Sequence, residues 1–118
     1  MEKEYWMSLA LKEAVKARNK DEVPIGCIIV KDDKVLARAH NLKIHKKDST
    51  CHAEVECIRK ACKKLNSYYL NDCEMYVTLE PCMMCTGAII QSRLKKIYIG
   101  TRDIKGGSIE SSIEIKKV

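Results

Sequence analysis

The pattern of apolar and polar positions predicts one helix and two strands in the first forty residues. Residues 3–19 place Met7, Ala10, Leu11, Ala14 and Val15 at the i, i+3, i+4, i+7, i+8 spacing of an amphipathic helix. The apolar run at 25–30 follows Pro24 and predicts a buried strand. A polar turn at 31–34 then leads into 35–40, which we expect to be the second strand of a hairpin.

The middle of the chain predicts a loop followed by a helix. Residues 41–50 are polar and basic and are typical of a loop. Ser49 and Thr50 are candidate N-caps for a helix over 52–65. That helix would have an apolar face and a basic face, made respectively of Cys57, Ile58, Ala61, Cys62 and Leu65, and of Arg59, Lys60, Lys63 and Lys64.

The last third continues the alternation. Residues 75–79 and 96–99 predict strands, and 82–93 predicts a helix that Pro81 precedes. The alternation of Ile113 and Ile115 with polar residues favours a short final strand within 108–118. This order of elements is typical of an α/β layered sandwich with a mixed sheet, folded as a single domain over 1–118.

Composition narrows this picture. The chain has 118 residues, no Phe and one Trp, so we expect an aliphatic core. Its seven cysteines are an odd number and amount to about 6%, below the level of a disulfide scaffold. The N-terminus is charged from its second residue, and no apolar run is long enough to span a bilayer. We therefore expect a cytoplasmic protein whose thiols are reduced or metal-bound.

The net charge of +6 is concentrated in one segment. Residues 34–64 contain nine Lys and Arg and three acids, and the rest of the chain balances. A local basic patch favours a polyanionic partner, although a well-solvated surface would look the same from composition alone.

Two short motifs carry candidate chemistry at two predicted helix starts, His52-Ala53-Glu54 and Pro81-Cys82-Met83-Met84-Cys85. Cys82 and Cys85 can face one point from a first helical turn, and His52 supplies a third ligand for zinc. Three protein ligands leave one position for water, which is typical of a catalytic zinc site. Glu54 would move the protons. H-x-E with P-C-x-x-C is an established signature of zinc nucleobase deaminases, so this is a match to a known pattern.

A structural zinc site is the main alternative. It would need a fourth ligand, for which Cys51 and then Cys73 are the candidates. The five cysteines outside P-C-x-x-C are otherwise expected to be small apolar core residues: Cys27, Cys51, Cys57, Cys62 and Cys73.

With these motifs in view, the sequence resembles the bacterial tRNA adenosine deaminases of the cytidine deaminase superfamily. HAE and PCxxC indicate only the superfamily, whereas the other matching pieces point to the tRNA enzymes. Those pieces are EYWM at 4–7, EVPIG at 22–26, Asn41, YVTLEPCMMC at 76–85, GAII at 87–90 and G-x-R-D-x-K-x-G at 100–107.

The resemblance implies a three-layer α/β/α cytidine-deaminase-like sandwich with about five strands. It implies one Zn²⁺ per chain held by His52, Cys82 and Cys85, with Glu54 as the catalytic proton shuttle. The implied reaction is hydrolysis of a tRNA wobble adenosine to inosine, with a tRNA anticodon loop as partner, in a homodimer. The short apolar runs of the sequence separately predict no membrane association. The positions of Ile25, Asn41, Ala53 and Asp103 line or approach the substrate in the family.

The sequence departs from the family after Gly107. Residues 108–118 are too few for a last strand and the usual C-terminal helix, so we expect that helix to be absent or shortened. HAEVECIRKAC and the NDC at 71–73 are also similar to free-guanine deaminases of the superfamily. A deaminase of a free nucleobase or nucleoside is therefore the alternative function, and a non-catalytic zinc-bound RNA-binding subunit is a more remote one.

Overall fold

The computed structural model describes residues 2–101. This range contains α1 (Lys3–Asn19), β1 (Gly26–Lys31), β2 (Lys34–His40), α2 (Ala53–Leu65), β3 (Glu74–Leu79), α3 (Met83–Ser92) and β4 (Lys96–Thr101). Every helix and strand expected before residue 101 is present, with ends that differ by one or two residues. Asp103 and the expected last strand within 108–118 lie outside the described residues. The expectation that the C-terminal helix is absent or shortened also concerns residues outside this range.

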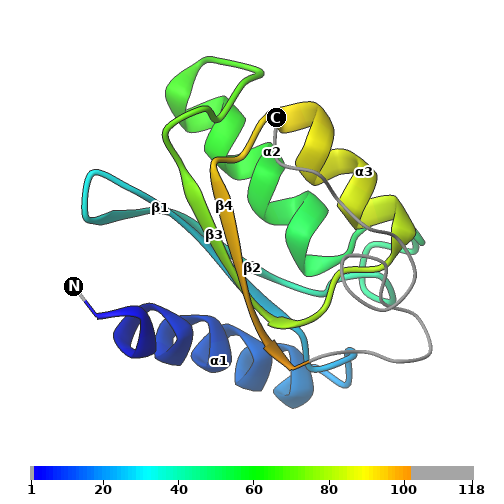
Figure 1. The fold of residues 1–118 in the computed structure, drawn as a ribbon. Coiled ribbons are helices and arrows are strands. Elements are labelled where there is room, and N and C mark those ends of the chain that lie inside the picture. Colours follow the sequence, from blue (N-terminus) through cyan, green and yellow to red (C-terminus); the bar gives the residue numbers. More distant parts are fainter. Residues whose placement is uncertain (1, 102–118) are drawn as a thin grey trace.

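The four strands form one mixed sheet in the order β2-β1-β3-β4. β1 is antiparallel to both β2 and β3, whereas β3 and β4 are parallel. β2, β3 and β4 therefore run in one direction and end at the same edge of the sheet. The loop into α2 and the short turn into α3 both leave from that edge (Figure 1).

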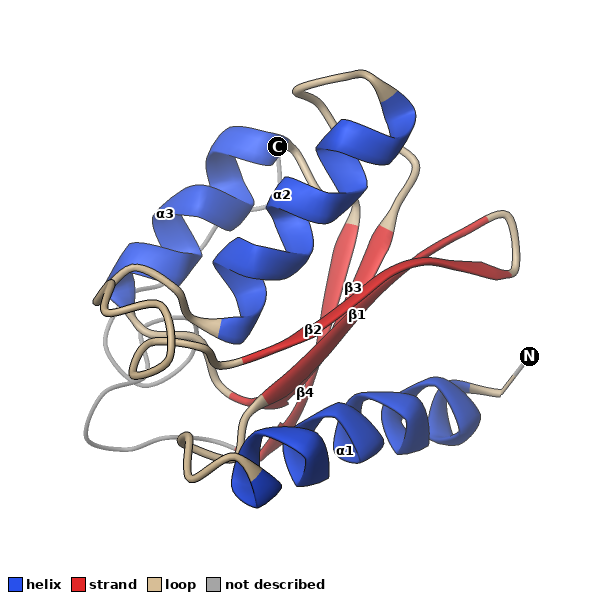
Figure 2. Cartoon of the chain, turned by 180° about the vertical axis from the view of Figure 1, so that it is seen from behind, coloured by secondary structure: helices blue, strands red, loops and turns tan. Residues whose placement is uncertain are grey.

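The helices cover the two faces of this sheet unequally. α1 lies on one face, and α2 and α3 lie side by side on the other (Figures 1 and 2). The result is a three-layer α/β/α sandwich, as expected from the sequence. Among residues 2–101, no helix is long and apolar enough to cross a membrane.

Each side of the sheet has its own core. The side under α2 and α3 is aliphatic and includes Ile29, Leu70, Met75 and Val77, together with buried cysteines. The α1 side is different, because Trp6 and Tyr76 are buried there, 6% and 2% exposed. The expectation of an aliphatic core is thus right for one side and wrong for the other.

α1 packs closely on β1 through a face rotated from the predicted one. Leu11 and Val15 are 53% and 42% exposed, and the buried face is instead formed by Trp6, Leu9, Ala10, Glu13, Ala14 and Ala17. A Cβ on Gly26 would overlap the backbone of Ala10 and Ala14, so glycine lets helix and strand approach. Buried Glu13 pairs with Lys16 one helical turn away and with His40 far along the chain, and the helical period could not reveal the second contact.

Candidate metal and catalytic site

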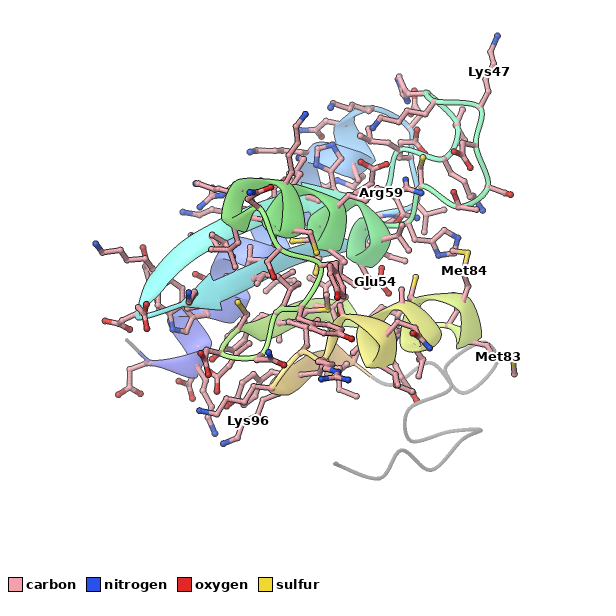
Figure 3. The ribbon with its side chains drawn as sticks, turned by 90° about the horizontal axis from the view of Figure 1, so that it is seen from above. Lys47, Glu54, Arg59, Met83, Met84 and Lys96 are labelled. Carbon is pink, nitrogen blue, oxygen red and sulfur yellow. The ribbon has the colours of Figure 1, made fainter. Side chains whose placement is uncertain are left out.

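The two motifs meet where α2 and α3 begin. His52 is the N-cap residue of α2, and Cys82 is the N-cap residue of α3. Cys85 follows in the first turn of α3 and is fully buried. Glu54 lies on α2 (Figure 3), two residues beyond His52. Both helices start at the sheet edge where β2 and β3 end, and this topology brings together residues that are 30 positions apart.

The three expected ligands are arranged for one metal ion. The Nδ1 atom of His52 lies 3.6 Å from the Cys82 sulfur and 3.5 Å from the Cys85 sulfur. All three candidate ligand atoms lie within 4.8 Å of one another. Ligands at 2.0–2.3 Å from a tetrahedral zinc are separated by about 3.5–3.8 Å, so both distances from His52 fit a shared zinc ion.

The electrostatics of the cluster also suit a cation. Burial, and then the neighbouring Glu54 and Cys82, raise the pKa of the Cys85 thiol far above its usual value. Burial and the charge of Lys43 lower the pKa of His52, which favours the neutral imidazole that a metal needs.

Glu54 is buried beside this cluster and is not one of the grouped ligands. It is 3% exposed, and burial raises the pKa of its carboxyl to about 7. Its Oε1 atom has no hydrogen-bond partner among the described residues. A buried carboxylate oxygen without a hydrogen-bond partner lowers the stability of the fold. A carboxyl that titrates near neutrality can both accept and return a proton.

The structure does not place a fourth ligand in the cluster. Among residues 2–101, the grouping of candidate metal ligands contains only His52, Cys82 and Cys85. Cys51 and Cys73 are buried elsewhere, 2% and 1% exposed, so neither supports a closed structural site. Four of the five other cysteines are buried and Cys62 is partly buried, in keeping with their expected packing role.

The start of α2 corrects one prediction. Neither Ser49 nor Thr50 is the N-cap, and the His52 side chain makes no capping hydrogen bond. Thr50 instead donates to Asp48, which closes a turn within the loop. Asn41 Oδ1 accepts the Ala53 N–H at 2.7 Å, so a residue from the end of β2 supplies the missing acceptor.

This contact also locates the expected substrate residues. Asn41 and Ala53 are buried and touch each other, and the Asn41 N–H donates to the Ile25 carbonyl. Ile25 is partly buried against the aliphatic core. The three residues therefore form one group at the start of α2, next to His52.

The basic segment is only partly paired. Lys46 contacts Glu56 Oε2 at 3.0 Å, and Arg59 lies 3.7 Å from its other carboxylate oxygen. Two of the three acids of the segment, Glu54 and Glu56, are buried, so the positive charge dominates its surface. Lys47 extends outward from the loop, and Met83 and Met84 mark the start of α3 (Figure 3).

Sequence reasoning assigned no role to two buried glutamates. Glu13 Oε1 accepts from His40 Nδ1 at 2.9 Å, and Glu13 Oε2 pairs with Lys16 at 2.7 Å. Glu22 accepts hydrogen bonds from the loop that leads to His52. EVPIG contains Glu22, but nothing in that motif indicates which segment its carboxylate contacts.

Comparison with known proteins agrees with this fold and site. The model of the cytidine and deoxycytidylate deaminase zinc-binding region matches residues 1–101. The chain belongs to this family of zinc-binding deaminase domains.

Three relatives show which kinds of deaminase this chain is similar to. A tRNA-specific adenosine deaminase from Aquifex aeolicus (strain VF5) is 47% identical over 115 residues, which are 98% of this chain and 76% of that relative. A structure from a study of A-to-I editing by tRNA:A34 deaminases at the wobble position superimposes with a TM-score of 0.91 and 46% identity, over 92% of this chain and 79% of that one. A guanine deaminase from Bacillus subtilis superimposes with a TM-score of 0.84 and 33% identity, over 100% of this chain and 86% of that one. The resemblance to tRNA adenosine deaminases is confirmed.

Proposed function

We propose that this chain is a zinc-dependent deaminase that hydrolyses adenosine to inosine at the wobble position of a tRNA. The observation that carries the proposal is the convergence of His52, Cys82 and Cys85 beside the buried, unpartnered Oε1 of Glu54. The names of two similar proteins, which are tRNA adenosine deaminases, support tRNA as the substrate. We assign one Zn²⁺ per chain to His52 Nδ1 and the two cysteine sulfurs.

In this proposal, some residues of the chain bind the metal and another transfers protons. Zinc bound there supplies Lewis-acid activation of water at neutral pH. Glu54 Oε1 takes one proton as the water oxygen attacks C6 of the flipped adenine. Glu54 gives that proton to N1 of the adenine and then moves the remaining hydroxyl proton to the departing amine, so that adenosine and water yield inosine and ammonia.

The neighbouring residues hold the base in this proposal. The Asn41 oxygen is engaged with Ala53, so its amide N–H groups are the donors available to the nucleoside. Ala53 and Ile25 would form the adjoining wall, and Asp103 would approach the substrate backbone. The basic loop beside His52 would contact anticodon-loop phosphates.

Three further assignments complete the proposal. Residues 1–118 act as a single domain, working in the cytoplasm where its tRNA substrate is found. The protein forms a homodimer, which is supported by exposed apolar side chains on α3: Met83, Met84 and Ile90 are 65%, 39% and 50% exposed. Light scattering of the purified protein tests the dimer directly.

The activity is tested with an anticodon stem-loop RNA that has adenosine at the wobble position. Zinc-loaded protein should convert that adenosine to inosine, measured by nucleoside chromatography after digestion. Glu54→Ala should keep zinc and fold but lose turnover. Activity that survives in Glu54→Ala would remove Glu54 from the mechanism.

Deamination of free guanine is the second candidate, because the guanine deaminase from Bacillus subtilis matches the whole chain at 33% identity. Ammonia release from guanine, with no inosine formed in RNA, would favour it. Salt dependence separates the two candidates further. Phosphate contacts weaken steeply with added salt, whereas turnover of a neutral base should not.

A further inference from the structure

The loop between β2 and α2 has an exposed tip at 44–49 and yet is internally hydrogen-bonded. We call residues 41–52 the 41–52 loop. The Leu42 N–H donates to the Cys51 carbonyl at 3.0 Å, which closes the base of the loop. Within it, the Lys46 N–H donates to Leu42 at 2.9 Å and the Asp48 N–H donates to Lys43 at 3.0 Å. These bonds give the loop a definite shape, but they do not attach its tip to the rest of the domain.

Glu22 attaches the backbone of that tip, and the Lys46 side chain pairs separately with Glu56 on α2 at 3.0 Å. The Glu22 side chain is fully buried and comes from the connection between α1 and β1. Oε1 accepts the Ile44 N–H at 3.1 Å, and Oε2 accepts both the His45 N–H and His45 Nδ1 at 2.7 Å. Burial alone would raise the pKa of Glu22, but these hydrogen bonds lower it below its usual value, so the carboxylate is charged. Charge-assisted hydrogen bonds of this kind are the strong ones in proteins.

The two residues held by Glu22 lie among the lysines of the loop. Lys43 precedes Ile44, and its carbonyl accepts the Asp48 N–H at 3.0 Å within the loop. Lys46 and Lys47 follow His45, and the Lys46 side chain is half exposed. Fixing the backbone at 44–45 therefore fixes the stretch of backbone from which these three lysines extend. A loop whose backbone is ordered in advance loses less conformational entropy when it binds a phosphate chain.

We propose that Glu22 is a positioning residue for substrate RNA: it holds the 41–52 loop so that Lys43, Lys46 and Lys47 meet the phosphates beside the target base. The proposal rests on the proposed function, since it takes the substrate to be a nucleic acid strand. Glu22 does not touch the reacting atoms. Its loss should therefore raise KM for RNA and leave kcat and the zinc content nearly unchanged.

Glu22→Gln is the informative variant, because it keeps the shape but removes the charge and one acceptor. An amide can accept one of the two backbone N–H groups, and its own NH₂ then faces the other donor. Asp21→Asn is the matched control. It removes the same charge one residue away, from an exposed side chain whose backbone φ of 60° also suits asparagine.

Glu22→Gln should raise KM for the stem-loop RNA about tenfold, the effect of weakening a charge-assisted hydrogen bond, with kcat within about twofold of the wild type. Asp21→Asn should match the wild type. His45→Ala removes only the ring contact and should raise KM less, and it serves as the test if Glu22→Gln does not fold. An unchanged KM in Glu22→Gln, or a fall in kcat with loss of zinc, would overturn the proposal.

Two measurements separate this proposal from the proposed function. Amide hydrogen exchange at Ile44 and His45 should accelerate in Glu22→Gln and not in Asp21→Asn, whatever the enzyme's substrate. Binding of the stem-loop should weaken when Glu22→Gln is added to the inactive Glu54→Gln protein. A wild type that makes no inosine would contradict the proposed function. Faster exchange with unchanged RNA binding would contradict only the positioning role.

Discussion

The start of α2 and the 41–52 loop are adjacent in sequence, and each lies against a buried carboxylate. The two carboxylates differ in their hydrogen bonds and in the direction of their pKa shifts. In the first region, Glu54 has an oxygen with no partner among the described residues, and burial raises its pKa to about 7. In the second, buried Glu22 accepts three hydrogen bonds, which outweigh the effect of burial and lower its pKa.

The difference shows how to distinguish reactive from structural carboxylates in this domain. A carboxylate with its acceptors filled is committed to one charge state and holds backbone in place. A buried carboxylate with a free acceptor beside metal ligands costs stability and is available to exchange a proton. Burial alone would not separate the two, because both side chains are almost inaccessible.

The largest expected effect concerns the metal ligands next to Glu54. Cys82→Ala should lose zinc and all measurable activity, and it should lower the melting temperature because metal binding is coupled to folding. Cys51→Ala is the matched control, since Cys51 is buried next to His52 and outside the ligand group. Zinc content by atomic absorption checks both variants. Equal zinc loss in the two would make Cys51 a fourth ligand.

The next effect separates reactivity from stability at Glu54. Glu54→Gln should lower kcat roughly 10³-fold, within the range for general acid–base catalysis. Its free energy of unfolding should stay equal or rise, since the substitution removes a buried charge that lacks a full set of hydrogen bonds. Steady-state kinetics and urea denaturation at fixed zinc measure the two quantities. A large loss of stability would mean that Glu54 is structural like Glu22.

The sequence predicts the elements and the ligand group well, because both depend on local signals. Helical and strand periods identify every element up to β4, and H-x-E with P-C-x-x-C identifies the residues that converge. Contacts between distant segments are not predictable in this way. The N-cap at His52 depends on Asn41, and buried Glu13 contacts His40, a partner that no spacing reveals.

A smaller effect is expected on stability at Glu22. Glu22→Ala leaves the N–H groups of Ile44 and His45 without their acceptor and should cost about 1–3 kcal/mol of unfolding free energy. Asp21→Ala should cost less, because its side chain is exposed. Urea denaturation at neutral pH compares the pair. A cost at Glu22 no larger than at Asp21 would contradict the structural role.

The smallest effect is on pH dependence. Hydrogen bonds lower the pKa of Glu22 in the folded chain, so its contribution is complete above the ordinary glutamate value of 4.5 and is lost as pH falls through the folded pKa. The stability difference between wild type and Glu22→Gln should therefore shrink on acidification below that value. Parallel urea titrations at several pH values measure it. A difference that grows in acid would have the wrong sign for this account.

The proposed activity depends above all on the buried carboxyl of Glu54 beside His52, Cys82 and Cys85. The most direct test follows inosine formation in an anticodon stem-loop with a wobble adenosine, by wild-type and Glu54→Gln proteins with matched zinc content. We predict inosine from the wild type and essentially none from the variant. Equal inosine from both proteins, or none from a zinc-loaded wild type, would contradict the account.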